Sequence, residues 1–244
     1  YFTAYSFKSA DVANRLASYQ SSVQLVRLDF SGDAPQLDVI ADYDSTNYTA
    51  ILGYKVLNNG NLVIGRMEPS NASGALSDGY IRNVEYWTIS RDQNGEIQKQ
   101  VAPVDYLFHA NRNFNYSCFV NQGASSEDAV LAYTDVSSGS FRNTLWRIPK
   151  PITPTSSITP IKISTDGGSA VCWSSYPAYV GDKIYSIWAQ WNTGNISLVE
   201  TTISNSASSQ SLNLLYNNGS SSGSWSGEAG RVNISKDYIV LIQH

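Results

Sequence analysis

The side chains able to take part in chemistry are mainly carboxylates and aromatic rings. The only histidines are His109 and His244, too few for a catalytic triad or a zinc site built on imidazole. Two carboxylic acids flanking a glycosidic bond could hydrolyse it, so a glycoside hydrolase is one alternative function. The acids available for such a pair are Asp29, Asp42, Glu85, Asp105, Glu127 and Glu200. The sequence does not indicate which of them lie close together.

Aromatic residues are the second chemical signal. The chain has six tryptophans and 16 tyrosines. Aromatic rings stack on the C–H faces of sugars, while neighbouring Arg, Lys, Glu and Asn side chains bind the hydroxyls. The same rings also fill the space between packed sheets, and that role accounts for more than half of them. The tryptophans are Trp87, Trp146, Trp173, Trp188, Trp191 and Trp225.

The elements that must position these side chains are β-strands. In the stretch 164–204, a short apolar strand over 170–173 and a polar turn precede an alternating strand over 183–191. A tight Asn-Thr-Gly turn and a second alternating strand over 196–203 follow. Asn-Gly turns at Gly60 and Gly95 predict two earlier hairpins. The sequence therefore predicts an all-β protein.

Hairpins near residues 94, 138 and 193 recur after roughly 40–55 residues, the size of a four-stranded propeller blade. The strands predicted at 1–7 and 237–243 have no hairpin partner, and a propeller commonly completes one blade from both ends of the chain. We therefore expect one domain over 1–244, a β-propeller of about five blades closed by the two termini. Because the earliest hairpins lie closer together, a β-sandwich or two small β domains is the alternative.

Three segments, 170–173, 183–185 and 198–200, resemble a blade of the fucose-binding propeller lectins of fungi. In that family a basic residue, a glutamate and an aromatic residue of each blade hold the sugar between adjacent blades. The resemblance therefore implies that this chain binds a carbohydrate.

Residue by residue, the resemblance implies a ligand-binding site at Lys183 and Glu200 with Trp173 or Trp191. The family prefers arginine where this chain has Lys183. The resemblance also implies that Arg82 is the basic residue of the preceding unit.

Composition and charge indicate an extracellular protein. Charged residues make up only 15% of the chain, and Ser, Thr, Asn, Gly and Tyr are abundant. The formal net charge of −4 and the lack of a basic cluster argue against nucleic acid as a partner. No apolar run approaches the roughly 18 residues that span a membrane. The chain opens at Tyr1 instead of Met, so we expect a processed, secreted product.

Two further features fit secretion. Cys118 and Cys172, the only cysteines, could form a disulfide in an oxidising compartment, or they are two small buried residues. Asn-X-Ser/Thr sequons predict a glycoprotein. They begin at Asn47, Asn71, Asn115, Asn195, Asn218 and Asn233.

We therefore expect a secreted, non-enzymatic lectin whose partners are glycans or glycoproteins, without a cofactor or a bound metal. The first alternative is an extracellular structural or adhesive subunit that self-assembles by β-strand exchange. The second is the glycoside hydrolase.

Overall fold

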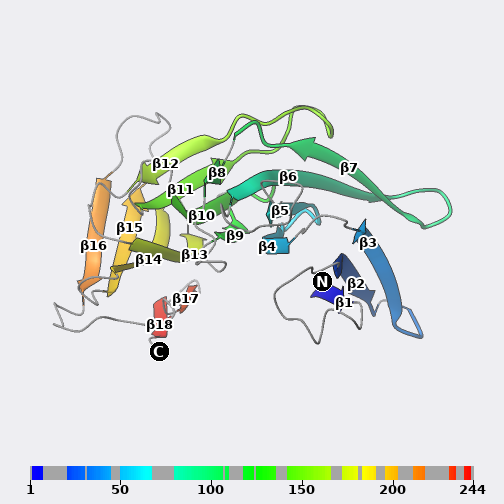
Figure 1. Ribbon diagram of the computed structural model, residues 1–244, viewed down its shortest axis with the longest axis horizontal. Helices are drawn as coiled ribbons and strands as arrows, with labels where there is room; N and C mark the ends of the chain where they lie inside the picture. Colours follow the sequence, from blue (N-terminus) through cyan, green and yellow to red (C-terminus); the bar gives the residue numbers. More distant parts are fainter. Residues whose placement is uncertain are drawn as a thin grey trace.

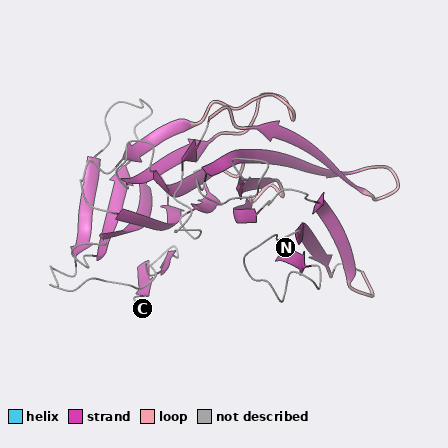
Figure 2. Cartoon of the chain, viewed as in Figure 1, coloured by secondary structure: helices cyan, strands magenta, loops and turns pink. Residues whose placement is uncertain are grey.

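A computed structural model describes most of the chain, and the regular elements of this part are all β-strands (Figure 2). The all-β prediction is therefore confirmed. No helix long and apolar enough to cross a membrane occurs among these residues. The described residues are 2–7, 21–30, 32–44, 50–67, 80–106, 108–109, 118–123, 125–135, 142–165, 172–180, 183–190, 196–202, 211–217, 231–234 and 239–242.

The strands form four antiparallel sheets and one hairpin, each built from strands that follow one another in the chain. The first sheet contains β1 (Phe2–Phe7), β2 (Ser21–Asp29) and β3 (Gln36–Asp44). The second contains β4 (Ala50–Val56), β5 (Leu62–Met67), β6 (Tyr80–Arg91) and β7 (Ile97–Pro103), with β8 (Phe108–His109) paired to β6. The third contains β9 (Cys118–Gln122), β10 (Ala129–Asp135), β11 (Arg142–Ile148) and β12 (Ile161–Thr165). The fourth contains β13 (Cys172–Val180), β14 (Lys183–Gln190), β15 (Ile196–Thr202) and β16 (Ser211–Asn217), and the hairpin is β17 (Arg231–Ile234) with β18 (Ile239–Ile242).

The sheets follow one another along an open arc, with the chain ends at its two extremes (Figure 1). The first strands of successive units are neighbours: β4 contacts β9, β9 contacts β13, and β13 contacts β17. Among the described residues, β1 pairs with β2 and β18 pairs with β17. The predicted closure of one blade by both termini is therefore not among the strand pairs that the structure describes.

Each middle sheet is buried on both faces. In β10, Ala129, Leu131 and Tyr133 face the second sheet, whereas Val130 and Ala132 face the fourth. All five are at most 1% exposed, which explains why this strand is a continuous apolar run. Successive side chains of a strand point to opposite faces, so an uninterrupted run is what two covered faces require.

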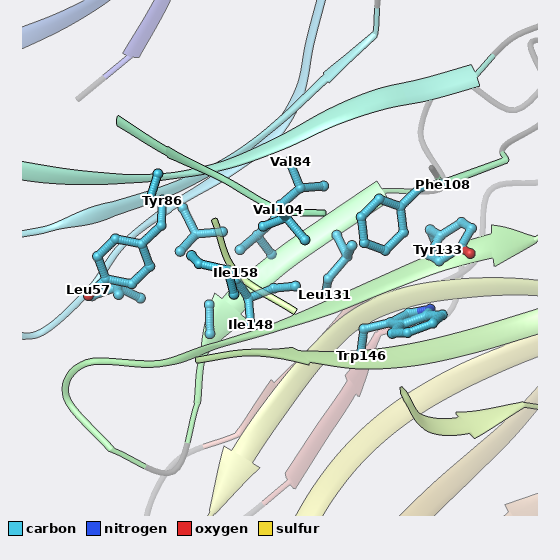
Figure 3. Close-up of a cluster of buried hydrophobic side chains, with 14 residues drawn as sticks. Leu57, Val84, Tyr86, Val104, Phe108, Leu131, Tyr133, Trp146, Ile148 and Ile158 are labelled. Carbon is cyan, nitrogen blue, oxygen red and sulfur yellow. The ribbon is translucent and has the colours of Figure 1, made fainter. Parts of the chain in front are cut away.

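The largest apolar cluster joins the second and third sheets (Figure 3). At its centre the Phe108 ring packs edge-on against Tyr133 and Trp146, with ring centroids 5.4 and 5.7 Å apart. A proline-rich connector over 149–160 closes one side of this cluster. Its Ile158 forms a parallel bridge with Val104, and the Ile158 N–H donates to the Pro103 carbonyl at 2.9 Å.

The first and second sheets are joined by an apolar cluster and by charges. Leu25, Ile40 and Ala41 pack against Leu62, Ile64 and Trp87 of the second sheet.

At the end of β6, Arg91 bonds Asp29 at 3.0 Å and approaches Asp38 at 3.6 Å. Arg27 bonds the same Asp29 oxygen at 2.6 Å. The outer ends of these two sheets are therefore linked by ion pairs.

The hairpins predicted at Gly60 and Gly95 are confirmed, and both glycines have positive φ. The predicted strand 170–173 differs from the structure, because β13 runs on to Val180 through a bulge between Ser175 and Ala178. The bulge breaks the alternation that would have revealed the strand.

We expect Leu131→Ala to lower the free energy of unfolding by about 2–5 kcal/mol, because the cavity would lie between two stacked sheets. Ile152→Ala is the control: Ile152 is 98% exposed, so its loss should stay within about 0.5 kcal/mol. Urea unfolding followed by tryptophan fluorescence measures both, and equal losses would contradict the stacking of the sheets.

Candidate functional site

The strand register identifies one pair of opposite residues that occupies the same place in the second, third and fourth sheets. Ala129 of the third sheet lies opposite Ile148, and both face the preceding sheet. Leu62 opposite Trp87 occupies this place in the second sheet, and Ile184 opposite Thr201 occupies it in the fourth. The second and third strands of the three sheets therefore share one register and one direction of each face.

In each of these sheets, the residue that precedes this position on the second strand forms a polar pair with the residue that precedes it on the third strand. The pair faces the following sheet. The members are diagonal to one another in the register. The donor–acceptor distances are 3.3 Å for Asn61–Tyr86, 2.9 Å for Arg147–Asp128 and 3.0 Å for Lys183–Glu200.

The first pair links two sheets. The Tyr86 hydroxyl is buried and donates to the backbone carbonyl of Glu127, in the loop that precedes β10, at 2.9 Å. The Asn61 Nδ2 donates to the same hydroxyl, and the Asn61 Oδ1 accepts from the backbone N–H of Ile89. These bonds consume the polar atoms of the pair, so its role is structural.

The second pair organises the loop between β9 and β10. Asp128 has a side chain only 3% exposed, and it accepts from the Ser125 backbone N–H at 2.9 Å as well as from Arg147. A Cβ at position 123 would lie 2.1 Å from the Asp128 Oδ1, so Gly123 is required for this close approach. This pair is also structural.

The third pair, Lys183 and Glu200, is the most open of the three. The Glu200 side chain is 12% exposed and that of Lys183 is 41% exposed. The ion pair balances the negative charge of the Glu200 carboxylate, while the Lys183 side chain extends into solvent.

The direction of this face follows from the strand pairing. Ile184 packs against the third sheet, so Lys183 and Tyr185 point the other way. Tyr185 lies directly opposite Glu200 in the register. The hairpin β17–β18 lies on this side of β13 and β14 (Figure 1). A lysine, a glutamate and a tyrosine therefore share the face of the fourth sheet that points away from the third sheet.

Of the two predicted tryptophans, only the backbone position of Trp173 is described, and the register does not place it beside this pair. Trp173 pairs with Ala189, whereas Lys183 pairs with Val180 at the other end of the β13–β14 hairpin. Six residues of strand separate the two positions, which is roughly 20 Å. Trp191 follows the last residue of β14 and lies outside the described residues.

Arg82 lies on β6, the third strand of its sheet, whereas Lys183 is on the second strand of its own. By register, the residue that corresponds to Lys183 in the second sheet is Asn61. The Arg82 side chain is outside the described part of the structure.

A different lysine, glutamate and tryptophan meet between the first two sheets. The Trp87 indole N–H donates to Glu85 at 2.7 Å, and the Lys99 Nζ lies 4.2 Å from the Trp87 ring centroid. Trp87 is fully buried, so its ring is closed to a ligand.

Partial burial raises the pKa of Tyr54, which packs against the apolar cluster between the first two sheets.

Two of the other carboxylates proposed for hydrolysis make ion pairs in the structure. Asp29 bonds Arg27 and Arg91, and Glu127 bonds Lys150. The hydrogen bond that the Lys150 ammonium donates to the Glu127 carboxylate raises the pKa of Lys150. Asp42 lies on β3, and its side chain is outside the described part. Over the side chains that the structure describes, no three His, Cys, Asp or Glu groups gather to hold a metal ion.

The cysteines begin two neighbouring strands, Cys118 in β9 and Cys172 in β13. Their side chains are outside the described part, so the disulfide stays a prediction. Asn233 lies on β17, and the other five sequon asparagines fall outside the described residues. Glycosylation likewise stays a prediction.

Comparison of the chain with protein-family models, with curated proteins and with solved structures gives no match. The class of protein defined by the structure is therefore an all-β protein of repeated, stacked antiparallel sheets.

Sequence reasoning did not include Tyr185 in the site. The alternation of β14 places Tyr185 on the same face as Lys183, which was a usable signal. Its position opposite Glu200 depends on the register of the hairpin. A turn centred near Thr193 sets that register only to within one residue, and a slip of one residue moves a side chain to the other face.

We expect Arg147→Met to lower the free energy of unfolding by about 2–3 kcal/mol, because it leaves the Asp128 carboxylate buried without its cation. The double variant Arg147→Met/Asp128→Asn should recover part of this loss, since the amide that replaces the carboxylate is neutral and its oxygen can still accept from Ser125. Urea unfolding measures both, and a double variant no more stable than Arg147→Met would count against the assignment.

Proposed function

We propose that the protein is a secreted, non-enzymatic carbohydrate-binding protein, a lectin. The observation that supports this most is the half-open Lys183–Glu200 ion pair with Tyr185 on the same face of the fourth sheet, the face that points away from the third sheet. Basic, acidic and aromatic side chains are the set that recognises a sugar.

The chemistry of binding follows from the three side chains. A sugar hydroxyl can accept from the Lys183 ammonium while the same or an adjacent hydroxyl donates to the Glu200 carboxylate. Hydrogen bonds to ionised groups contribute about 1.5–3 kcal/mol each. The Tyr185 ring supplies a flat apolar surface beside them. The ion pair holds both charged groups in place before the ligand arrives, which reduces the entropic cost of binding.

The contacts of the carboxylates favour binding over hydrolysis. Glu85, Glu127 and Glu200 bond an indole N–H, a lysine and a lysine respectively. A hydrolase needs one acid to protonate the leaving group and a second about 5–9 Å away. In each of these three contacts the partner of the carboxylate is a nitrogen donor and not a second candidate acid.

We also propose that the stacked sheets belong to a β-propeller. The repeat of four antiparallel strands in chain order, the contacts between successive first strands and the burial of both faces support it. In a propeller the space between adjacent blades is where the Lys183–Glu200 face would bind its ligand.

A glycan array tests the proposed function. We expect the unmodified protein to bind a restricted set of glycans. Glu200→Gln and Lys183→Met should each weaken this binding at least tenfold or so, because each removes one charge-assisted hydrogen bond. Trp173→Ala should leave the binding of a monosaccharide unchanged, because its position lies roughly 20 Å away along the strand.

The matched control is Glu127→Gln, which alters a second lysine–glutamate pair, one that lies at the surface. It should bind as the unmodified protein does. A blank array with folded protein would contradict the lectin. Binding kept in both Glu200→Gln and Lys183→Met would keep the lectin and reject this site.

A further inference from the structure

The fourth sheet presents two buried hydroxyl groups to the third sheet. Ile184 packs into the apolar cluster between these two sheets. Thr201 lies directly opposite Ile184 in the β14–β15 pair, and Ser186 follows Ile184 by two residues on the same strand. Residues directly opposite one another share a face of the sheet, and so do residues two apart on one strand, so both hydroxyls are on the face that packs on the third sheet. Ser186 and Thr201 are fully buried.

The protein does not satisfy these hydroxyls. Within the part of the chain that the structure describes, the Ser186 Oγ and the Thr201 Oγ1 are buried and have no hydrogen-bond partner. A hydroxyl that leaves water and gains no partner destabilises the folded state. In the large majority of cases a buried polar atom is therefore bonded to a protein group or to an ordered water. An internal water molecule can supply the bonds that Ser186 and Thr201 lack.

The corresponding positions of the two preceding sheets are large and apolar. These positions are Ile148 and Leu131 in the third sheet, and Trp87 and Ile64 in the second. All four are fully buried. The fourth sheet therefore has two smaller, hydroxylated side chains where its counterparts have bulky hydrocarbon. An internal water needs polar partners and room, and the fourth sheet differs from its counterparts in both respects.

The strand register also gives the spacing of the two hydroxyls. Ser186 lies opposite Val199, two residues before Thr201, so Ser186 and Thr201 are diagonal neighbours. The β-carbons of diagonal neighbours are up to roughly 7–8 Å apart. A water molecule with one hydrogen bond of about 2.8 Å to each hydroxyl spans a gap of this size.

We propose that an internal water molecule binds between the third and fourth sheets and bridges the Ser186 Oγ and the Thr201 Oγ1. One hydroxyl donates to the water oxygen, and the water donates to the other hydroxyl. Tyr185 and Glu200 each precede one of these residues in the chain and therefore lie on the opposite face of the sheet. The water thus lies behind the Lys183–Glu200 face, and the proposal does not depend on what that face binds.

The sign of a stability change tests the site. Thr201→Val removes the hydroxyl and nearly keeps the shape of the side chain, and Ser186→Ala removes the other hydroxyl. We expect each variant to have a lower urea midpoint than the unmodified protein, because the water loses a partner. Without a water the sign is reversed, since removal of an unpaired buried hydroxyl stabilises the fold. An unchanged or raised midpoint in Thr201→Val would overturn the proposal.

The double variant Thr201→Val/Ser186→Ala shows whether the two hydroxyls share one water. If they do, the first substitution already breaks the bridge, so the loss in the double variant should be smaller than the sum of the single losses. Additive losses would reject a shared water.

A high-resolution crystal structure of the unmodified protein gives a direct readout. We expect electron density for one water within about 3 Å of both hydroxyl oxygens. The double variant should lack this density. An interface without a water in the unmodified protein, or a water kept in the double variant, would contradict the proposal. Neither result bears on the glycan array, which reports on the other face of the sheet.

Discussion

The structure depends on the burial of both faces of its middle sheets. A two-faced apolar sheet is unstable in water by itself, so each unit needs a neighbour on either side. Strand β10 shows the requirement most clearly, because Leu131 packs toward the second sheet and Val130 toward the fourth. The arc of stacked sheets follows from this constraint, and the loops and ion pairs add to it.

Burial of both faces creates a problem of register. In a sheet with one wet face, a slip of one residue exposes the apolar set and is therefore costly. In β10 both sets are apolar, so hydrophobicity alone discriminates weakly between registers. The polar pairs supply the missing information: a slip of one residue would move Asp128 away from Arg147 and direct a charge into an apolar contact. In the fourth sheet the Lys183–Glu200 pair occupies the equivalent place, so the proposed binding site uses a position that in its two counterparts sets the fold.

Much of the fold was predictable from local signals. The Asn-Gly turns were recognisable because a hairpin turn of this kind demands positive φ, which glycine adopts without strain. Gly60 and Gly95 both have positive φ in the structure. The grouping of hairpins into units was less accessible. The hairpin at Gly95 joins the third and fourth strands of its sheet, whereas those near 138 and 193 join the second and third. The apparent period therefore compared unlike hairpins, because local patterns do not state which strand of a sheet they belong to. For the site, resemblance gave Lys183 and Glu200, which the structure brings together. Contacts between sheets could not be predicted, because they join segments far apart in the sequence. One example is the hydrogen bond that the Asn121 amide donates to the Pro177 carbonyl.

The ion pairs at the junction of the first two sheets make the attachment of the first sheet depend on salt. Arg27, Arg91, Asp29 and Asp38 are partly exposed, and their attraction is screened over about 10 Å in 0.1 M salt. The apolar contacts are strengthened by excluded salts such as sulfate. Ionic strength and the identity of the salt therefore act on this junction in opposite directions. The attachment of the first sheet to the second therefore responds to the ionic composition of the surroundings.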